Sequence, residues 1–269
     1  WKERKERLHT YFTPGTPKTQ MQLSFSNHYN LFEQLFFKES RGKSLEVGCG
    51  RGNLSLYFAH NGWETTLLDN SSKTLRVAEE NFKSCDFKGQ FVKGDANRLP
   101  FEDKTFDTTF SVGLFEHFRD AEKAVREQFR VLKKNGVFIG YVVPSRKFNV
   151  QSLAKPLNVF LSMFKSFIDP GVDKFKKDKD LLYRNTLSSG HYMKIMSELP
   201  FSKKGSFGIF PVPSISYSEI YPFTPLPRIM ESSVVALQKA VLGTRGIFMK
   251  HPWRCTEFWG QAFVVWGIK

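Results

Sequence analysis

The chain has 269 residues, of which 41% are hydrophobic, so it can bury a sizeable core and an intrinsically disordered protein is excluded. No stretch approaches roughly 18 consecutive apolar residues, which excludes a membrane-spanning helix. The net charge of +14 either favours an anionic partner or only improves solubility.

Short apolar runs alternate with helical patterns through the first half of the chain. The runs predict strands at residues 44–47, 65–68, 91–92, 106–111 and 137–143. Apolar residues at helical spacing predict helices over residues 53–60, from the N-cap Ser71 through Phe82, and from Asp120 to the Asn135-Gly136 pair. This alternation predicts a doubly wound, Rossmann-like α/β fold with a mostly parallel sheet, which places ligands at the carboxyl ends of the strands.

The second half of the chain continues the pattern and adds two inserts. Residues 189–199 predict a helix, and residues 206–210 and 262–268 predict strands. In the insert at residues 145–186, a helical apolar stripe begins after Pro156. In the insert at residues 211–256, such a stripe ends before Gly243. Each insert is interpreted as a helical lid or, alternatively, as an amphipathic helix packed on the outer helices.

Three glycines follow the first predicted strand, at positions 48, 50 and 52. A dinucleotide fingerprint would need its third glycine where Asn53 stands, so NAD is the weaker interpretation. Asp69 ends the second strand, 19 residues after Gly50, where a carboxylate accepts from both ribose hydroxyls. A nucleoside without a pyrophosphate fits both observations, although Asp69 in ordinary turn chemistry remains an alternative.

Five ordered segments resemble the motifs of the class I S-adenosylmethionine-dependent methyltransferases. The resemblance is to their small-molecule branch (methyltransferase type 11-like), which is related to ubiquinone and sterol methyltransferases. The segments are LEVGCGRGN, TTLLDNS, VKGDANRLPF, FDTTFSVGLFEHF and LKKNGVFIGYVVP, all between Ser44 and Pro144. The resemblance implies a seven-stranded sheet whose last strand, residues 262–268, is antiparallel.

The resemblance also implies a cofactor site. S-adenosylmethionine, whose product is S-adenosylhomocysteine, would be held by Glu46, Gly48, Cys49, Gly50, Asp69, Asn70, Asp95, Ala96 and Ser111. The carboxylate of Glu46 would suit the ammonium and sulfonium groups of this cofactor, which favour negative potential.

Residues for catalysis and acceptor binding are predicted around the methyl end of the cofactor. Glu116 and His117 follow the fourth strand and are candidates for a base or for an acceptor-orienting group, although a hydrogen-bonded structural role is an alternative. Candidate acceptor contacts are Tyr11, His28, Tyr29, His191 and Tyr192. No metal is expected, because Ser145 and Arg146 follow the fifth strand in place of clustered carboxylates.

Two domain-level regions are predicted: an N-terminal cap at residues 1–43 and a cofactor-binding domain at residues 44–269. Residues 45–143 carry 14 basic and 14 acidic side chains, whereas residues 144–269 carry 18 and 8. The excess positive charge therefore lies in the segments that flank this central block. These flanks also contain 17 of the 28 phenylalanines, and they are the variable parts that would select the acceptor.

The leading functional prediction is methyl transfer by in-line displacement to a small, apolar or aromatic, possibly anionic acceptor. A nucleic-acid methyltransferase is disfavoured, because Ser111-Val112-Gly113-Leu114 stands where an NPPY-like tetrapeptide would be. A membrane-surface lipid or quinone methyltransferase and a non-catalytic cofactor-binding module remain alternatives.

The cellular setting follows from the cysteines. Cys49, Cys85 and Cys255 show no CxxC spacing, which predicts reduced thiols, a cytoplasmic location and no structural zinc. The sequence begins with Trp1, so we expect that it was trimmed there. No oligomeric state is predicted.

Overall fold

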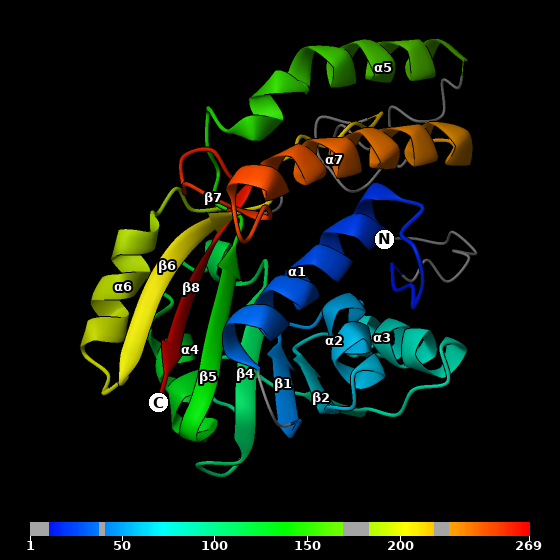
Figure 1. Cartoon of the computed structure of the whole chain (residues 1–269). Helices are drawn as coiled ribbons and strands as arrows, with labels where there is room; N and C mark the ends of the chain where they lie inside the picture. The colour runs from blue at the N-terminus through cyan, green and yellow to red at the C-terminus, as the bar shows by residue number, and fades with distance from the viewer. Residues whose placement is uncertain (1–10, 38–40, 169–182, 218–225) are drawn as a thin grey trace.

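The computed structural model describes residues 11–37, 41–168, 183–217 and 226–269. Its described residues form a single eight-stranded sheet with the order β3-β2-β1-β4-β5-β8-β6-β7 (Figure 1). The strands are β1 Lys43–Val47, β2 Glu64–Asp69, β3 Gln90–Lys93, β4 Phe106–Val112, β5 Leu132–Val142, β6 Lys203–Ile209, β7 Arg254–Cys255 and β8 Ala262–Ile268.

The predicted mixed sheet is confirmed. Strands β3, β2, β1, β4 and β5 pair in parallel, and β8 is antiparallel to both β5 and β6. The eighth strand is the two-residue β7, which pairs with the end of β6 and was not predicted. Because the parallel strands share one direction, the ends of β1, β2 and β4 meet at one edge of the sheet.

Helices cover both faces of the sheet. They are α1 Gln20–Phe36, α2 Asn53–His60, α3 Ser72–Ser84, α4 Glu122–Val131, α5 Lys155–Ile168, α6 Ser189–Ser197 and α7 Arg228–Phe248, with the short 3-10 turns η1 Phe115–His117 and η2 Val150–Leu153. One buried core joins the sheet to α1, α2 and α3, and a second joins it to α4 and α6. This is the doubly wound arrangement that the alternating pattern predicted.

The prediction that Asn135-Gly136 closes the fourth helix was wrong. Helix α4 ends at Val131, and β5 begins at Leu132. Asn135 has a φ of 64° inside β5, where the pairing with β4 shifts register after Phe106. An Asn-Gly pair supplies the left-handed backbone that a β-bulge needs as readily as the one that ends a helix.

The two inserts contain the predicted helices, α5 and α7. Helix α7 continues through Gly243 to Phe248, so the predicted end before Gly243 was wrong. Its buried face is formed by Glu231, Val235, Gln238 and Leu242, whereas most of the predicted apolar stripe is exposed, namely Met230, Leu237 and Val241.

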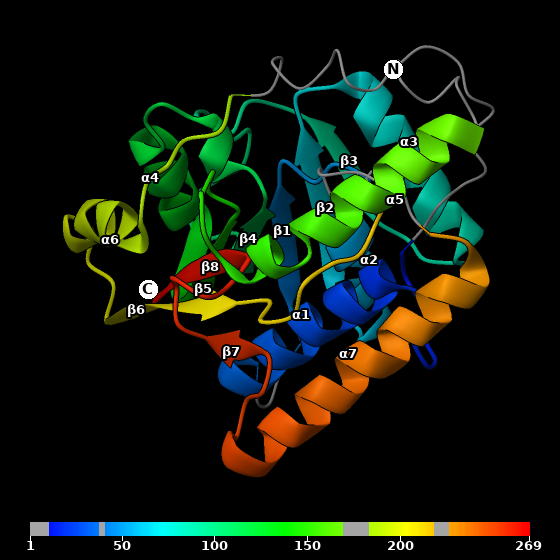
Figure 2. The same cartoon turned by 90° about the horizontal axis from the view of Figure 1, so that it is seen from above.

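Hydrogen bonds explain which face of α7 is buried. The Glu231 carboxylate accepts from the backbone N of Gln20 at 2.9 Å and from its side-chain Nε2 at 3.1 Å. The Nε2 of Gln238 donates to the carbonyl of Pro213 at 2.7 Å and to Oε1 of Gln20 at 3.2 Å. A buried polar network of this kind fixes α7 against the start of α1 (Figure 2).

Within the described ranges, no helix is both long and apolar enough to cross a membrane.

Candidate functional site

The turn after β1 has the backbone geometry that its glycines permit. Gly48, Gly50 and Gly52 have φ values of 69°, 53° and 68°, in the left-handed region that side chains resist. A Cβ on Gly48 would lie 2.7 Å from Cδ1 of Leu114. A Cβ on Gly50 would meet no described atom within 4 Å. Gly50 therefore borders open space in which a ligand can approach the backbone.

Asp69 joins the end of β2 to this turn. One of its carboxylate oxygens accepts from the backbone N of Gly50 at 3.2 Å, and the other accepts from that of Ser71 at 2.9 Å. Both oxygens retain a further lone pair, which suits a carboxylate that accepts from ribose hydroxyls. The predicted Asn70 follows and is exposed.

The end of β3 lies beside the end of β2, because the backbone N of Gly94 donates to the carbonyl of Asp69 at 3.1 Å. This contact brings the predicted residues Asp95 and Ala96 to the same edge. Asp95 is exposed, and its Oδ1 accepts from the backbone N and from the Nδ2 of Asn97 at 2.9 and 3.1 Å. Ala96 is buried.

Glu46 is a buried carboxyl group under the glycine turn. It accepts from the Ser55 hydroxyl at 2.5 Å, and burial raises the pKa of Glu46 to about 8. Burial, with smaller effects from Glu46 and Asp69, also raises the pKa of the Cys49 thiol. The turn therefore combines two carboxyl groups with a thiol that stays protonated, a setting that favours a cationic ligand.

Ser111 is buried in β4, near the same edge, and its hydroxyl finds no hydrogen-bond partner among the described residues. A buried hydroxyl without a partner is unusual, and a bound ligand is one way to satisfy it.

Glu116 and His117 both lie in η1 but differ in environment. Glu116 is buried, its Oε2 has no partner within the described chain, and burial raises the pKa of its carboxyl to about 7. The Nδ1 of His117 lies 2.7 Å from the carbonyl oxygen of Tyr183, so a backbone contact already occupies that nitrogen. Of the two, Glu116 has the properties of a proton acceptor.

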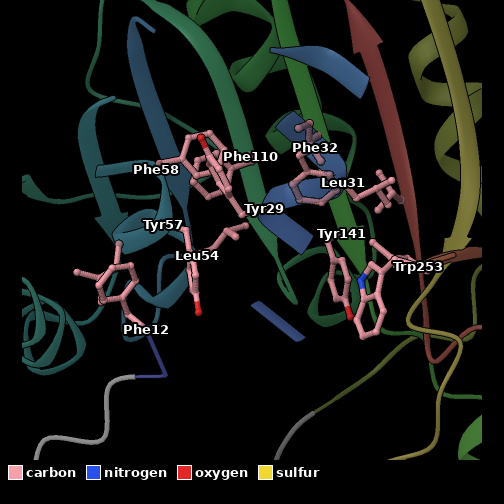
Figure 3. Close-up of a cluster of buried hydrophobic side chains, with 14 of the residues drawn as sticks. Phe12, Tyr29, Leu31, Phe32, Leu54, Tyr57, Phe58, Phe110, Tyr141 and Trp253 are labelled. Atoms are coloured by element: carbon pink, nitrogen blue, oxygen red, sulfur yellow. The ribbon is translucent and has the colours of Figure 1, made fainter. Parts of the chain in front are cut away.

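His28 belongs to an aromatic group between α1 and β5. Its Nδ1 accepts from the indole Nε1 of Trp253 at 2.9 Å, and its ring centroid lies 4.8 Å from that of Tyr141. Burial lowers the pKa of His28 to about 3, so its ring stays neutral. Burial and, next, the nearby Glu116 raise the pKa of Tyr141. Figure 3 shows the side chains of Tyr141 and Trp253 close to each other.

The remaining predicted acceptor residues are dispersed. The backbone N of Tyr11 donates to Oδ1 of Asn53, at the start of α2, which brings the N-terminal segment beside the glycine turn. Tyr29 packs in the core, and its hydroxyl donates to Glu33 at 3.2 Å (Figure 3). His191 is exposed, and the buried Tyr192 donates to the carbonyl of Phe115 at 3.4 Å.

Three residues at the site were not predicted to have a role there: Asn53, Tyr141 and Trp253. In the sequence, Asn53 served only to argue against a dinucleotide fingerprint, which needs a glycine at that position. Tyr141 was assigned only to the fifth predicted strand. A surface hollow of about 440 Å³ lined by Gln34, Leu35, Lys250 and His251 contains none of the predicted site residues.

Comparisons with known proteins agree with this geometry. Residues 45–140 match the family described as "Methyltransferase domain". Over 118 residues the chain is 34% identical to a demethylmenaquinone methyltransferase of Thermotoga maritima, covering 42% of this chain and 50% of the relative. Over 101 residues it is 38% identical to the mitochondrial arginine-hydroxylase NDUFAF5 of Danio rerio, covering 37% and 30%. The matches thus span half or less of these curated relatives.

A solved structure extends the similarity beyond the matched segment. The YcgJ protein of Bacillus subtilis superposes with a TM-score of 0.56 at 22% identity, over 91% of this chain and 98% of that protein. At this identity the similarity shows the fold alone. Together, the matched segment, the sheet order and the ordered motifs around the glycine turn identify residues 45–140 as a methyltransferase domain of the class I S-adenosylmethionine-dependent kind.

Proposed function

We propose that the chain transfers the methyl group of S-adenosylmethionine to a small apolar or aromatic acceptor. The observation that carries the acceptor class is a buried carboxyl, Glu116, near Tyr141, whose ring packs against His28, which in turn is hydrogen-bonded to Trp253. The names of relatives support it, since they include quinone, sterol and squalene methyltransferases. A hydroxylase among the relatives shows that this domain alone does not decide the reaction, so the activity needs a direct test.

The glycine turn fits the cofactor. The open space at Gly50 lets the ligand approach the backbone, Asp69 offers lone pairs for the ribose, and Glu46 offers a carboxyl group that a cationic ligand would favour in its ionised form. When bound, S-adenosylmethionine supplies a sulfonium methyl group whose transfer leaves a neutral thioether. The sulfur is a good leaving group, so the protein's task is to align the acceptor and to exclude water.

Glu116 would receive the proton if the methylated group carries one. As the acceptor takes the methyl group that the cofactor would supply, the acceptor's proton would pass to the Glu116 carboxylate. The pKa of about 7 suits this role, because a base works best when its pKa lies near the operating pH.

The test of this function is methyl transfer from cofactor with a labelled methyl group. The acceptor panel contains quinones, phenols, sterols, amines and RNA. We expect label in the quinone, phenol or sterol fraction. Label only in RNA would replace the acceptor class, and no transfer by a protein that binds the cofactor would favour a binding module.

Replacing Glu116 with glutamine is expected to lower kcat by roughly 10²- to 10⁴-fold for an acceptor that loses a proton, the usual scale of general base catalysis. In the parent protein the carboxylate fraction of Glu116 rises as the pH passes its pKa of about 7, so kcat should rise from pH 6 to pH 8. The variant should lose this rise. The measurement is the dependence of kcat on pH.

The matched control is Glu64→Gln, which removes an exposed carboxyl at the opposite end of the sheet. It should leave the profile unchanged. A Glu116→Gln protein that keeps both the rate and the rise with pH would remove Glu116 from the reaction.

A further inference from the structure

Helix α5 has an exposed apolar face. Leu157, Phe160 and Phe164 are separated by three and four residues, so they lie on one side of the helix, and they are between 46% and 64% exposed. Large aromatic side chains gathered on a water-exposed face are unusual in a soluble domain and mark an interaction surface.

Helix α7 has a second such face. Met230, Leu237, Val241 and Phe248 follow one another at intervals of seven, four and seven residues and are between 39% and 85% exposed. A different face of the helix is held to α1 by the network around Glu231. The apolar stripe is therefore turned outward by the way that the helix is anchored.

The two helices are fixed to the same segment of chain. Nδ2 of Asn158 on α5 donates to the carbonyl of Ser214 at 3.0 Å, and Oδ1 of Asn158 accepts from the backbone N of Ser216 at 3.1 Å. Gln238 on α7 donates to the carbonyl of the adjacent Pro213. These contacts hold both helices beyond the carboxyl ends of the parallel strands (Figures 1 and 2).

The exposed charges on these helices have one sign. Among the described side chains of α5 and α7 the cations are Lys155, Arg228, Lys239 and Arg245, whereas the acidic side chain is Glu231, which is buried. Lys155 and Arg228 are exposed at the starts of the two helices. By helical spacing, Lys155 lies on the side of α5 away from Leu157 and Phe164. Arg228 likewise lies on the side of α7 away from Met230 and Leu237. An apolar face with cations on the polar side of the helix is the pattern of helices that lie in the interface of a membrane.

We infer that the exposed faces of α5 and α7, here called the α5–α7 surface, dock onto an anionic lipid bilayer. The apolar side chains enter the boundary between headgroups and acyl chains, and the cations contact anionic headgroups. A second copy of the chain would bring cations against cations, which disfavours a dimer through this surface. A nucleic acid would leave the apolar side chains in water.

Docking also deepens the proposed function. Because the surface lies at the same end of the sheet as Gly50 and Glu116, a docked protein would meet an apolar acceptor dissolved in the bilayer. This consequence depends on the proposed function, whereas docking itself does not.

The experiment is co-sedimentation of the full chain, without cofactor or acceptor, with phosphatidylcholine vesicles that contain or lack phosphatidylserine. We expect binding that requires the anionic lipid and weakens as salt is added. The Phe160→Ser and Phe164→Ser pair, and separately the Leu237→Ser and Phe248→Ser pair, should each lower the partition coefficient about tenfold or more. The Lys155→Glu and Arg228→Glu pair should lower it about tenfold or more.

The matched charge control is the Lys83→Glu and Lys88→Glu pair, which changes two exposed lysines near the opposite end of the sheet. It makes the same change in net charge and should bind nearly as the parent does. Equal binding to both kinds of vesicle, or undiminished binding by the surface variants, would overturn the inference. A lipid-free dimer that these variants dissociate would also overturn it. Methyl transfer is not measured, so a failure here leaves the proposed function standing.

Discussion

Replacing Asp69 with alanine is expected to weaken the binding of S-adenosylmethionine by about 1–3 kcal/mol, which is roughly 5- to 150-fold in Kd. The reason is the loss of a charged acceptor placed beside the open space at Gly50, and of the contact that holds the turn to β2. Isothermal calorimetry with the cofactor measures the change directly.

Two further variants separate binding from folding. Asp69→Asn keeps one acceptor oxygen but no charge, so its affinity should lie between those of the parent and of the alanine variant. Glu80→Ala removes an exposed carboxylate from the neighbouring helix α3 and should bind as the parent does. Unchanged affinity in a folded Asp69→Ala protein would remove Asp69 from the cofactor site.

The parts of the fold that the sequence predicted well are those set by local patterns. Each strand of the parallel part is a short apolar run, and the turn at Gly48 and Gly50 needs backbone angles that glycine supplies. Once these strands are parallel, their carboxyl ends meet. The proximity of Gly50 and Asp69, 19 residues apart, then follows from topology.

The parts that could not be predicted depend on contacts between distant segments. Trp253 donates a hydrogen bond to His28, which lies 225 residues away in the sequence. No local sequence pattern around either residue predicts this contact. The orientation of α7 is similar. Its apolar stripe left open whether the helix is a lid or packs through that stripe, and the hydrogen bonds of Glu231 and Gln238 to Gln20 bury a different face. Periodicity shows that a helix has two faces, and tertiary contacts decide which face is buried.

The wrong end of the fourth helix has a different cause. Asn135-Gly136 is a strong turn signal, but it does not distinguish the end of a helix from a bulge at the start of a strand. Pairing of β5 with β4 on one side and β8 on the other settles the choice, and these partners lie far away in the sequence.

Replacing Glu46 with glutamine is expected to remove a large pH dependence from the stability of the protein. Burial raises the pKa of Glu46 from 4.5 to about 8, so the folded protein binds one more proton than the unfolded chain between these values. The parent's free energy of unfolding should therefore fall as the pH rises through this window. The loss from this group approaches ~4 kcal/mol at pH 8, taking about 1.36 kcal/mol per pKa unit.

The glutamine side chain is neutral throughout and still offers an oxygen to the Ser55 hydroxyl, so the variant should gain on the parent by about 3–4 kcal/mol between pH 5 and pH 8. Urea unfolding at a series of pH values measures this difference, with the exposed Glu64→Gln as control. Burial also raises the pKa of Glu116 to about 7, but Glu116 is present in both proteins, so its contribution to the pH dependence cancels in the difference between their free energies of unfolding. A difference that does not change with pH would mean that Glu46 is ionised in the folded protein. The proton on Glu46 should also respond to cofactor binding. A cationic cofactor beside Glu46 favours the ionised carboxylate, so binding near neutral pH should release this proton.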